Sequence, residues 1–320
     1  MSFAKELKQE LVDRVPSGRH CRIAEVAGMM LYGGTVEECG DGSRNLVFST
    51  EKENIAKKCF TFLKKSFNMN IVAGETTVES RRARRYTVRV SGEDDVRNCT
   101  EEMGFAWPKG RPLQATEALA DWEWTVPERA CCARSLLRGM FLMGGTMNDP
   151  DKSYHYEIAV PSEQIGLKVA EVFSQFDCEP KIWERRGSKV IYLKDAEQIA
   201  DALTVMDASA ARMRFEDVRV VRSMRGAVQR KVNCEVSNIA KTTRASKRQV
   251  EAIETIRQLM GLSELPKELE EMARIRLENP VASLQELGSY ADPPIGRSGV
   301  NHRLQKLCDI AEGLRLKEGG

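Results

Sequence analysis

One octapeptide occurs twice in the 320-residue chain, and its copies lie 111 positions apart. The first copy is Gly28-Met29-Met30-Leu31-Tyr32-Gly33-Gly34-Thr35, and the second is Gly139-Met140-Phe141-Leu142-Met143-Gly144-Gly145-Thr146. Six of the eight residues are identical, and each copy ends an apolar run with helical spacing. Because glycine has no Cβ, two helices that carry glycines at these positions can approach closely. The repeat therefore predicts an internal duplication whose halves meet along a seam of paired helices.

The segments after the two copies show the same order of helices and strands. In the first half the patterns predict helix 19–33, two strands around Asp41-Gly42, helix 51–67, strands 71–79 and 86–90, and helix 93–103. In the second half they predict a helix entering at Pro127, hairpin 146–160, helix 162–176, hairpin 181–193 and helix 196–206. A leading helix covers 3–14, and residues 110–121 connect the halves. We expect an α+β domain with the order α-β-β-α-β-β-α given twice.

Strand patterns are absent after residue 212, where we expect an all-helical domain. Helices are predicted at 224–242, 247–260 and 267–278, with Ser246 and Gln249 in capping-box spacing for the second. Ser283 and Glu286 form another such pair, ahead of a short helix that Gly288 would cap. A final helix begins near Ser298. The expected domains are residues 1–110 with the first repeat, 111–211 with the second, and 212–320 with a basic connector and the helical domain.

Positive charge is concentrated in one stretch of a chain whose net charge is only +2. Residues 212–248 carry 11 basic and three acidic side chains, whereas residues 1–211 carry 29 basic and 32 acidic ones. Such a stretch favours binding to a polyanion, and its candidate phosphate contacts are Arg230, Lys231, Lys241 and Arg244. A solvated basic helix and linker is the alternative interpretation.

The last predicted helix has an apolar face and a polar face. Its apolar residues, at steps of four and three, are Val300, Leu304, Leu307, Ala311 and Leu314. Ser298, Asn301, His302 and Gln305 fall on the opposite face, where such side chains can address base edges in a major groove. Arg297, Arg303 and Lys306 flank them as candidate phosphate contacts.

A support helix, a break and an exposed polar helix resemble a helix-turn-helix, which would bind double-stranded DNA. The connection from Ser289 to Arg297 is nine residues, however, where a turn of three or four is usual. An amphipathic helix with a solvated face remains the alternative interpretation.

The cysteine and histidine content argues against a metal or disulfide framework. Nine cysteines are an odd number without a CxxC pair, and the histidines are three: His20, His155 and His302. We expect reduced, mostly buried thiols and no metal site or cofactor. The charged N-terminus has no apolar core typical of a secretory signal, and no window is long and apolar enough for a membrane span. We therefore expect a cytoplasmic protein without membrane contact.

The two halves resemble the LAGLIDADG homing-endonuclease fold, whose paired helices each open an α-β-β-α-β-β-α unit. The C-terminal third resembles the WhiA family of bacterial regulators. The strings that carry this second resemblance are Arg230-Lys231-Val232-Asn233-Cys234-Glu235, Leu277-Glu278-Asn279-Pro280 and Ser298-Gly299-Val300-Asn301-His302-Arg303-Leu304. With both resemblances the match covers essentially the whole chain.

The resemblance implies a transcriptional regulator that binds DNA near promoters and acts in cell division, chromosome segregation and, in spore formers, sporulation. It also implies association with the nucleoid and, in some members, contact with a sigma factor of RNA polymerase. Target genes, and activation as opposed to repression, do not follow from it.

Aligning the repeats with the nuclease motif places Gly33 and Gly144 at the two catalytic positions. LAGLIDADG nucleases hold divalent metal there with one carboxylate from each helix, and glycine supplies no ligand. Glu37, Glu38, Asp149 and Asp151 are near in sequence but lie past the helix ends. We therefore expect no nuclease activity and no catalytic residues, with Gly33 and Gly144 keeping the seam helices close.

Corresponding hairpins of the two repeats are basic: residues 81–85 include four arginines, and residues 185–189 include two arginines and a lysine. In the nuclease fold such strands form a saddle over DNA, so a retained phosphate contact is one hypothesis. Solvated hairpin tips on a net acidic domain are the other. A second class of function stays open, that of an adaptor whose saddle binds a protein or small ligand, with DNA binding secondary.

Overall fold

The structure is a computed structural model that describes residues 2–40, 42–78, 83–109, 113–185 and 188–318. Internal contacts divide the chain into two units, Met1–Ser223 and Met224–Gly320, and each is described by itself. No helix in the described ranges combines the length and the apolar character that crossing a membrane requires.

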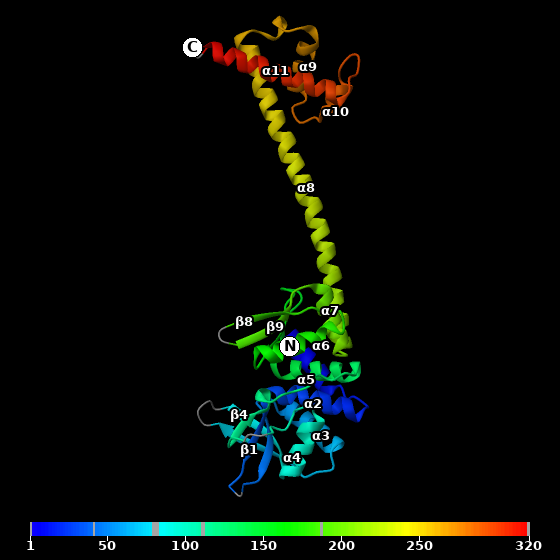
Figure 1. The fold of residues 1–320 in the computed structure, drawn as a ribbon. Coiled ribbons are helices and arrows are strands. Elements are labelled where there is room, and N and C mark those ends of the chain that lie inside the picture. Colours follow the sequence, from blue (N-terminus) through cyan, green and yellow to red (C-terminus); the bar gives the residue numbers. More distant parts are fainter. Residues whose placement is uncertain (1, 41, 79–82, 110–112, 186–187, 319–320) are drawn as a thin grey trace. The chain divides into compact units, whose positions relative to one another are not determined.

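The first unit contains the duplicated α-β-β-α-β-β-α order (Figure 1). The first repeat consists of α2 (Arg19–Gly33), β1 (Gly34–Glu38), β2 (Arg44–Thr50), α3 (Glu53–Ser66), β3 (Ile71–Val78), β4 (Ala83–Ser91) and α4 (Glu93–Glu102). The second consists of α5 (Ala130–Gly144), β6 (Gly145–Met147), β7 (Tyr156–Val160), α6 (Glu163–Ser174), β8 (Lys181–Arg185), β9 (Ser188–Leu193) and α7 (Ala196–Val205). Helix α1 (Phe3–Asp13) precedes them. The predicted α+β class and the duplication are confirmed.

Each repeat builds its own antiparallel sheet. The strand orders are β3-β4-β2-β1-β5 in the first sheet and β6-β7-β9-β8 in the second. Helices α2 and α5 lie side by side, with the first sheet next to α2 and the second next to α5 (Figure 1). The buried residues of both repeats form one continuous apolar core.

Two glycines allow α2 and α5 to pack backbone against backbone. A Cβ on Gly28 would lie 2.3 Å from the carbonyl oxygen of Leu136, and a Cβ on Gly139 would lie 2.0 Å from that of Glu25. These contacts are equivalent in the two repeats, since each position is offset by 111 residues. No side chain fits at so short a distance. The predicted close seam is confirmed.

The connection between the repeats differs from the prediction in two respects. Residues 116–118 form strand β5 (Thr116–Ala118), which pairs with β1 and completes the first sheet. Helix α5 begins at Ala130 rather than at Pro127. The chain ahead of it is held extended against the end of the first repeat, because the Thr125 N–H donates to the Gly104 carbonyl at 2.9 Å.

Helix α8 (Ser209–Leu259) is continuous, so the expected break between residues 242 and 247 is wrong. Residues 227–260 contain neither glycine nor proline, and nothing in the backbone therefore stops the helix. Ser246 does not cap a helix. Its hydroxyl instead donates to the carbonyl of Pro280, within the second unit.

The second unit packs α8 against α9 (Lys267–Glu278), α10 (Leu284–Ser289) and α11 (Arg297–Glu318). The Ser283 and Glu286 capping box is confirmed. Gly288 is not the cap, because α10 continues to Ser289. A Cβ on Gly288 would lie 2.2 Å from the Ile295 carbonyl oxygen, so this glycine allows the following chain to pass close to α10.

Candidate nucleic-acid interface

The four residues expected to address bases lie exposed on α11. The apolar stripe behind them is fully buried at Val300, Leu304 and Leu307, which fixes the rotation of the helix. Ser298, Asn301, His302 and Gln305 are all exposed as a result. A recognition helix needs this arrangement, because packing fixes its buried face and leaves hydrogen-bonding side chains exposed on the opposite face.

The four side chains differ in whether they already have hydrogen-bond partners within the protein. Gln305 accepts a hydrogen bond from Arg248 Nη2 at 3.3 Å and donates from Nε2 to Asp309 Oδ1 at 2.8 Å. Within the described part of the chain, Ser298, Asn301 and His302 have no hydrogen-bonded partner for their side chains. A base contact by Gln305 would replace existing bonds, whereas one by Asn301 would not.

The flanking cations also differ in their surroundings. Arg297 and Lys306 are exposed. Arg303 is 19% exposed, and its guanidinium lies 3.4 Å from Glu268 Oε2 and 3.7 Å from Glu271 Oε2 on α9. Arg303 thus holds α11 against α9.

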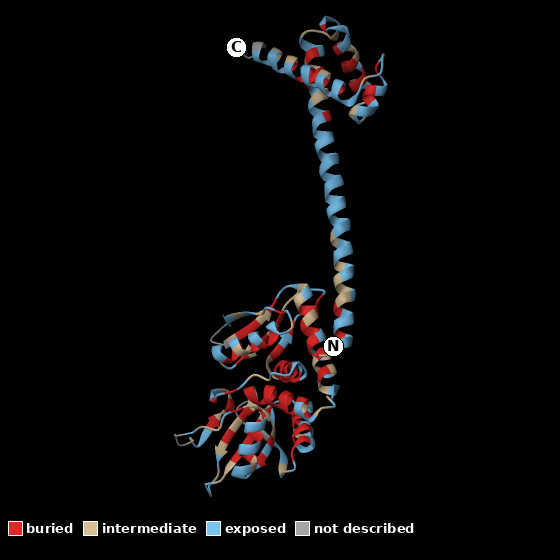
Figure 2. Cartoon of the chain, turned by 45° about the vertical axis from the view of Figure 1, so that its right-hand side comes forward, coloured by how far each residue is buried: buried red, intermediate tan, exposed pale blue. Residues whose placement is uncertain are grey.

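A pocket of about 430 Å³ joins the basic segment of α8 to the start of α11. It brings together three of the predicted contacts, Lys241, Arg297 and Asn301. Arg230, Lys231 and Arg244 do not line it, but they are exposed on the same helix as Lys241, within the stretch 227–245 that is exposed throughout (Figure 2).

Two buried polar groups of this pocket escaped the sequence analysis. Arg276 of α9 is 2% exposed, and its Nη1 donates to the carbonyl of Ala282 at 2.8 Å. Burial lowers the pKa of Arg276. Its Nε and the Oε1 of Gln249 lack a hydrogen-bond partner among the described residues. The sequence signal for Arg276 was its position as a charged residue on an otherwise buried helix face. The direction in which its side chain points, however, depends on how the helices pack.

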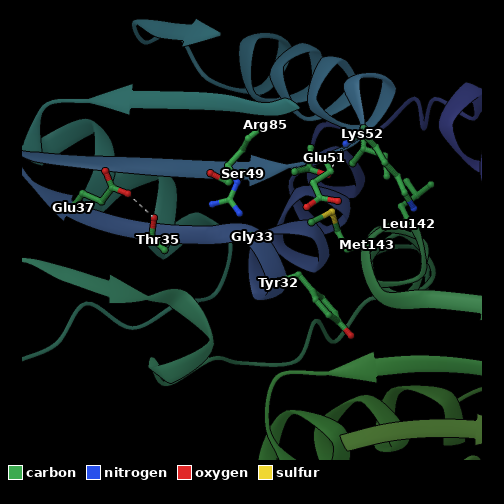
Figure 3. A pocket seen from close by; sticks show the side chains of 12 residues that line it. Tyr32, Gly33, Thr35, Glu37, Ser49, Glu51, Lys52, Arg85, Leu142 and Met143 are labelled. Atoms are coloured by element: carbon green, nitrogen blue, oxygen red, sulfur yellow. Dashed lines mark hydrogen bonds between the residues drawn. The ribbon is translucent and has the colours of Figure 1, made fainter. Parts of the chain in front are cut away.

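The two positions aligned with nuclease carboxylates lie where the seam helices end. Gly33 lines a pocket of about 470 Å³ together with Glu37, Glu51 and Arg85. Figure 3 shows Glu37 at one end of this pocket and Glu51 beside Met143 at the other. Thr35 donates its hydroxyl to Glu37 at 3.2 Å.

Backbone packing leaves no room for a Cβ at Gly33, whereas a Cβ at Gly144 would have to displace the Tyr32 side chain. A Cβ on Gly33 would lie 2.4 Å from the carbonyl oxygen of Ser49, and one on Gly144 would lie 2.1 Å from the Tyr32 hydroxyl across the seam. Of the nearby carboxylates, Glu38 is 3.3 Å from Arg44, and Asp149 accepts the N–H of Asp151. In the described ranges none of these carboxylates belongs to a group of three or more His, Cys, Asp or Glu side chains close enough to hold one metal ion.

The basic hairpins are described only in part. Arg81, Arg82, Arg186 and Gly187 lie outside the described residues. Of the remaining cations, Arg84 lies 3.6 Å from Glu75, Arg185 lies 3.7 Å from Glu157, and Lys189 lies 2.8 Å from Glu184. Each of these three cations therefore has a carboxylate neighbour.

Comparisons with known proteins agree with this architecture. Three family models match: the WhiA N-terminal LAGLIDADG-like domain at residues 19–106, the WhiA LAGLIDADG-like domain at 133–225, and the WhiA C-terminal HTH domain at 228–311. A protein of Lachnoclostridium phytofermentans named probable cell division protein WhiA is 37% identical over 321 residues, covering 98% of this chain and 100% of the relative. The chain belongs to the WhiA family.

A second WhiA relative, from Clostridium novyi and with the same name, is 37% identical over 324 residues and covers all of both chains. The crystal structure of full-length WhiA from Thermatoga maritima matches with a TM-score of 0.56 at 24% identity, over 98% of this chain and 99% of that one. This likeness shows that the WhiA fold extends over both units. The match to the WhiA C-terminal HTH domain extends from within α8 into α11 and includes the helix-turn-helix predicted from the sequence.

Proposed function

We propose that this chain is a sequence-specific, DNA-binding transcriptional regulator of cell division. The observation that carries the proposal is the pocket that joins Lys241 of α8 to Arg297 and Asn301 of α11, because it places cations beside the exposed face of a helix in an HTH domain. The names of the relatives from Lachnoclostridium phytofermentans and Clostridium novyi supply the cellular process.

In this proposal α11 enters the major groove of double-stranded DNA. Ser298, Asn301 and His302 address base edges first, and Gln305 does so by exchanging its bonds to Arg248 and Asp309. Phosphates are contacted from α11 by Arg297 and Lys306, and from α8 by Arg230, Lys231, Lys241 and Arg244. Arg303 reaches a phosphate only by leaving Glu268 and Glu271, so its main task is to position α11.

The LAGLIDADG-like domain is proposed to be without nuclease activity. Gly33 and Gly144 replace the two metal-binding carboxylates of the nuclease motif, and both glycines already have a packing role. The test is incubation of the full-length protein with its DNA target and Mg²⁺ or Mn²⁺. Metal-dependent strand cleavage that persists after repurification would refute this part of the proposal.

Finer roles rest on the family resemblance. They are control of genes for cell division, chromosome segregation and, in spore formers, sporulation, with contact to a sigma factor and action at the nucleoid in the cytoplasm. Co-purification of RNA polymerase with the tagged protein, before and after nuclease treatment, tests the sigma contact. A contact that survives DNA removal supports it.

The experiment that tests DNA reading is affinity capture of sheared genomic DNA by the full-length protein at physiological salt, followed by sequencing. Discrete peaks upstream of genes are expected, and Asn301→Ala should reduce or move them. Glu312→Gln, at an exposed position further along α11, is the matched control and should leave them unchanged. Uniform, weak recovery would show phosphate binding alone.

An adaptor is the second candidate function, and a charge observation favours it. Residues 1–211 carry three more acidic than basic side chains, and Arg84, Arg185 and Lys189 have carboxylate neighbours. The discriminating measurement is the salt dependence of DNA affinity after Arg84, Arg85 and Arg185 are replaced by alanine together. An unchanged slope favours the adaptor, and a shallower slope favours a saddle that contacts phosphates.

A further inference from the structure

The duplication brings two reactive pairs together at one end of the seam. His20-Cys21 are the second and third residues of α2, and Cys131-Cys132 are the second and third residues of α5. The pairs are offset by 111 residues, as the two octapeptides are. Because α2 and α5 pack on each other through equivalent residues, their equivalent first turns also meet. Three cysteines and one histidine thereby lie next to each other.

The distances within this cluster are short. The Nδ1 of His20 is 3.1 Å from the sulfur of Cys132, 3.3 Å from that of Cys21 and 3.9 Å from that of Cys131. All four potential ligand atoms lie within 4.8 Å of one another. Tetrahedral zinc, with bonds of about 2.3 Å to sulfur and about 2.0 Å to nitrogen, separates its ligands by about 3.5 to 3.8 Å. The cluster therefore has the dimensions of a zinc site.

We propose that His20, Cys21, Cys131 and Cys132 bind one Zn²⁺ ion that joins the first turns of α2 and α5. Three thiolates and an imidazole are a ligand set of structural zinc sites, and soft sulfur ligands favour zinc over magnesium or calcium. All four positions are filled by protein ligands, so the ion is structural and has no open position for a substrate.

The surroundings suit such an ion. Both pairs lie in first turns, where the helix dipole favours negative charge. Burial raises the pKa of the Cys21 and Cys132 thiols, so the bound cation itself has to bring about their deprotonation. A zinc ion with three thiolates carries one net negative charge, and Arg129 lines the pocket of about 330 Å³ next to the cluster, where Arg19 is paired with Glu102 at 2.8 Å.

Access and ring position also fit. Cys21 and Cys132 are buried, whereas His20 and Cys131 are exposed, so a metal ion can enter from solvent. Gly18 leaves room for the imidazole, since a Cβ at that position would lie 2.9 Å from His20 Nε2. The ring can therefore present Nδ1 to the three sulfurs.

The structural consequence is a link between residues that are 111 positions apart. A folded chain holds the four ligands together, whereas an unfolded chain does not, so zinc stabilises the folded state by mass action. The link lies at the opposite end of α2 and α5 from Gly33 and Gly144, and it would fix the start of the seam as those glycines fix its end.

The first test is metal titration of the reduced, full-length protein after removal of metals by a chelator. Co²⁺ should bind one equivalent per chain and give thiolate-to-cobalt charge-transfer and tetrahedral ligand-field absorption, which Zn²⁺ then abolishes. Cys131→Ser and His20→Ala alter exposed ligands and should each weaken affinity by more than about 10-fold, the lower end of the loss from changing even an outer-shell partner. Cys234→Ser, at an exposed cysteine of α8, is the control and should bind as the parent does.

The second test is protection of thiols from alkylation, mapped by peptide mass. Zinc should slow the modification of Cys131, Cys132 and Cys21 and leave that of Cys39 and Cys234 unchanged. Three results would overturn the proposal: absence of the thiolate-cobalt band, equal zinc affinity in the parent and Cys131→Ser, or a disulfide within the cluster that persists in reductant and excludes zinc. Circular dichroism of each variant checks that the fold is retained.

Discussion

Arg138 donates its Nε–H to Glu25 Oε2 at 2.9 Å across the seam of α2 and α5, and both side chains are buried. The other oxygen of Glu25 lies 2.6 Å from Lys58 Nζ, and Arg138 Nη1 donates to Asp207 Oδ2 at 2.9 Å. The network ties both repeats to the segment just before α8. Its charges are stable in the interior only as long as each has its partner.

Glu25→Ala should strongly destabilise the first unit. It leaves Lys58 and Arg138 as buried cations without their shared carboxylate, and breaking such a pair costs about 3–5 kcal/mol. The free energy of unfolding in urea measures the loss. Glu38→Gln removes a carboxylate from a partly exposed pair with Arg44 and should cost less than about 1 kcal/mol. Equal losses in the two variants would contradict a special role for the buried network.

Gly139→Ala should destabilise the protein by about 1–3 kcal/mol, because the new methyl group would meet the Glu25 carbonyl oxygen and push the seam helices apart. Gly40→Ala is the matched control. A Cβ on Gly40 has no neighbour within 4 Å, so its effect should stay within about 0.5 kcal/mol. Thermal melts of the two variants make the comparison, and similar melting temperatures would show that the seam can widen freely.

Gly144→Val should also lower stability. The valine would occupy the place of the Tyr32 ring, whose hydroxyl lies 2.1 Å from the position of a Cβ. A double variant with Tyr32→Ala should recover part of the loss, because it removes the side chain that is displaced. An unchanged melting temperature for Gly144→Val alone would refute the packing role of this glycine.

Lys8 should make stability depend on pH above neutrality. Burial, with the charge of Lys52 nearby, lowers the pKa of Lys8 from 10.5 to about 7. The folded state disfavours the charged amine, so the contribution of this group to stability rises with pH between about 7 and 10.5 and is constant below that range. Lys8→Met should therefore stabilise most near neutral pH, by an amount that shrinks toward pH 10. Urea unfolding across this range tests it, with the exposed Lys5→Met as control, and a difference independent of pH would contradict it.

One variant on α8 and one on α11 should distinguish contacts to bases from contacts to phosphates. Lys241→Ala should weaken all duplexes alike and make the slope of log affinity against log salt shallower by about 1. Asn301→Ala should cost about 1–3 kcal/mol on the captured target alone and leave the slope unchanged. Fluorescence anisotropy over a salt series distinguishes them. Identical behaviour of the two variants would argue against a reading helix.

The order of elements in the repeats could be predicted because each signal is local. Asp41-Gly42 precedes a strand, Ser162 caps α6, and Gly33 ends α2, so neighbours in sequence decide these boundaries. The duplication of the octapeptide then predicted that α2 and α5 pack against each other. The same locality explains the exposed face of α11, which follows from its spacing of apolar residues.

The features that were predicted wrongly or missed all depend on contacts between residues far apart in the sequence. Ser246 matched a cap by spacing, yet its hydroxyl is used by Pro280, 34 residues away. Strand β5 forms because its three residues pair with the open edge of β1. The sequence of so short a segment does not indicate this pairing. The cluster of His20, Cys21, Cys131 and Cys132 lacks metal-binding spacing within either pair. The repeat offset of 111 was the signal that could have found it.

Strand β5 makes the two halves unequal. It comes from the connecting segment, yet it belongs to the sheet of the first repeat, and the Phe105 bridge to Trp124 extends this dependence to residue 124. Strand β6, the counterpart of β1, has β7 as its single neighbour in the described sheet. A chain divided at residue 110 would take a strand away from the first half, whereas division after Thr125 would keep that half complete. The segment that connects the two repeats is therefore a structural part of the first repeat, and the two repeats are not interchangeable.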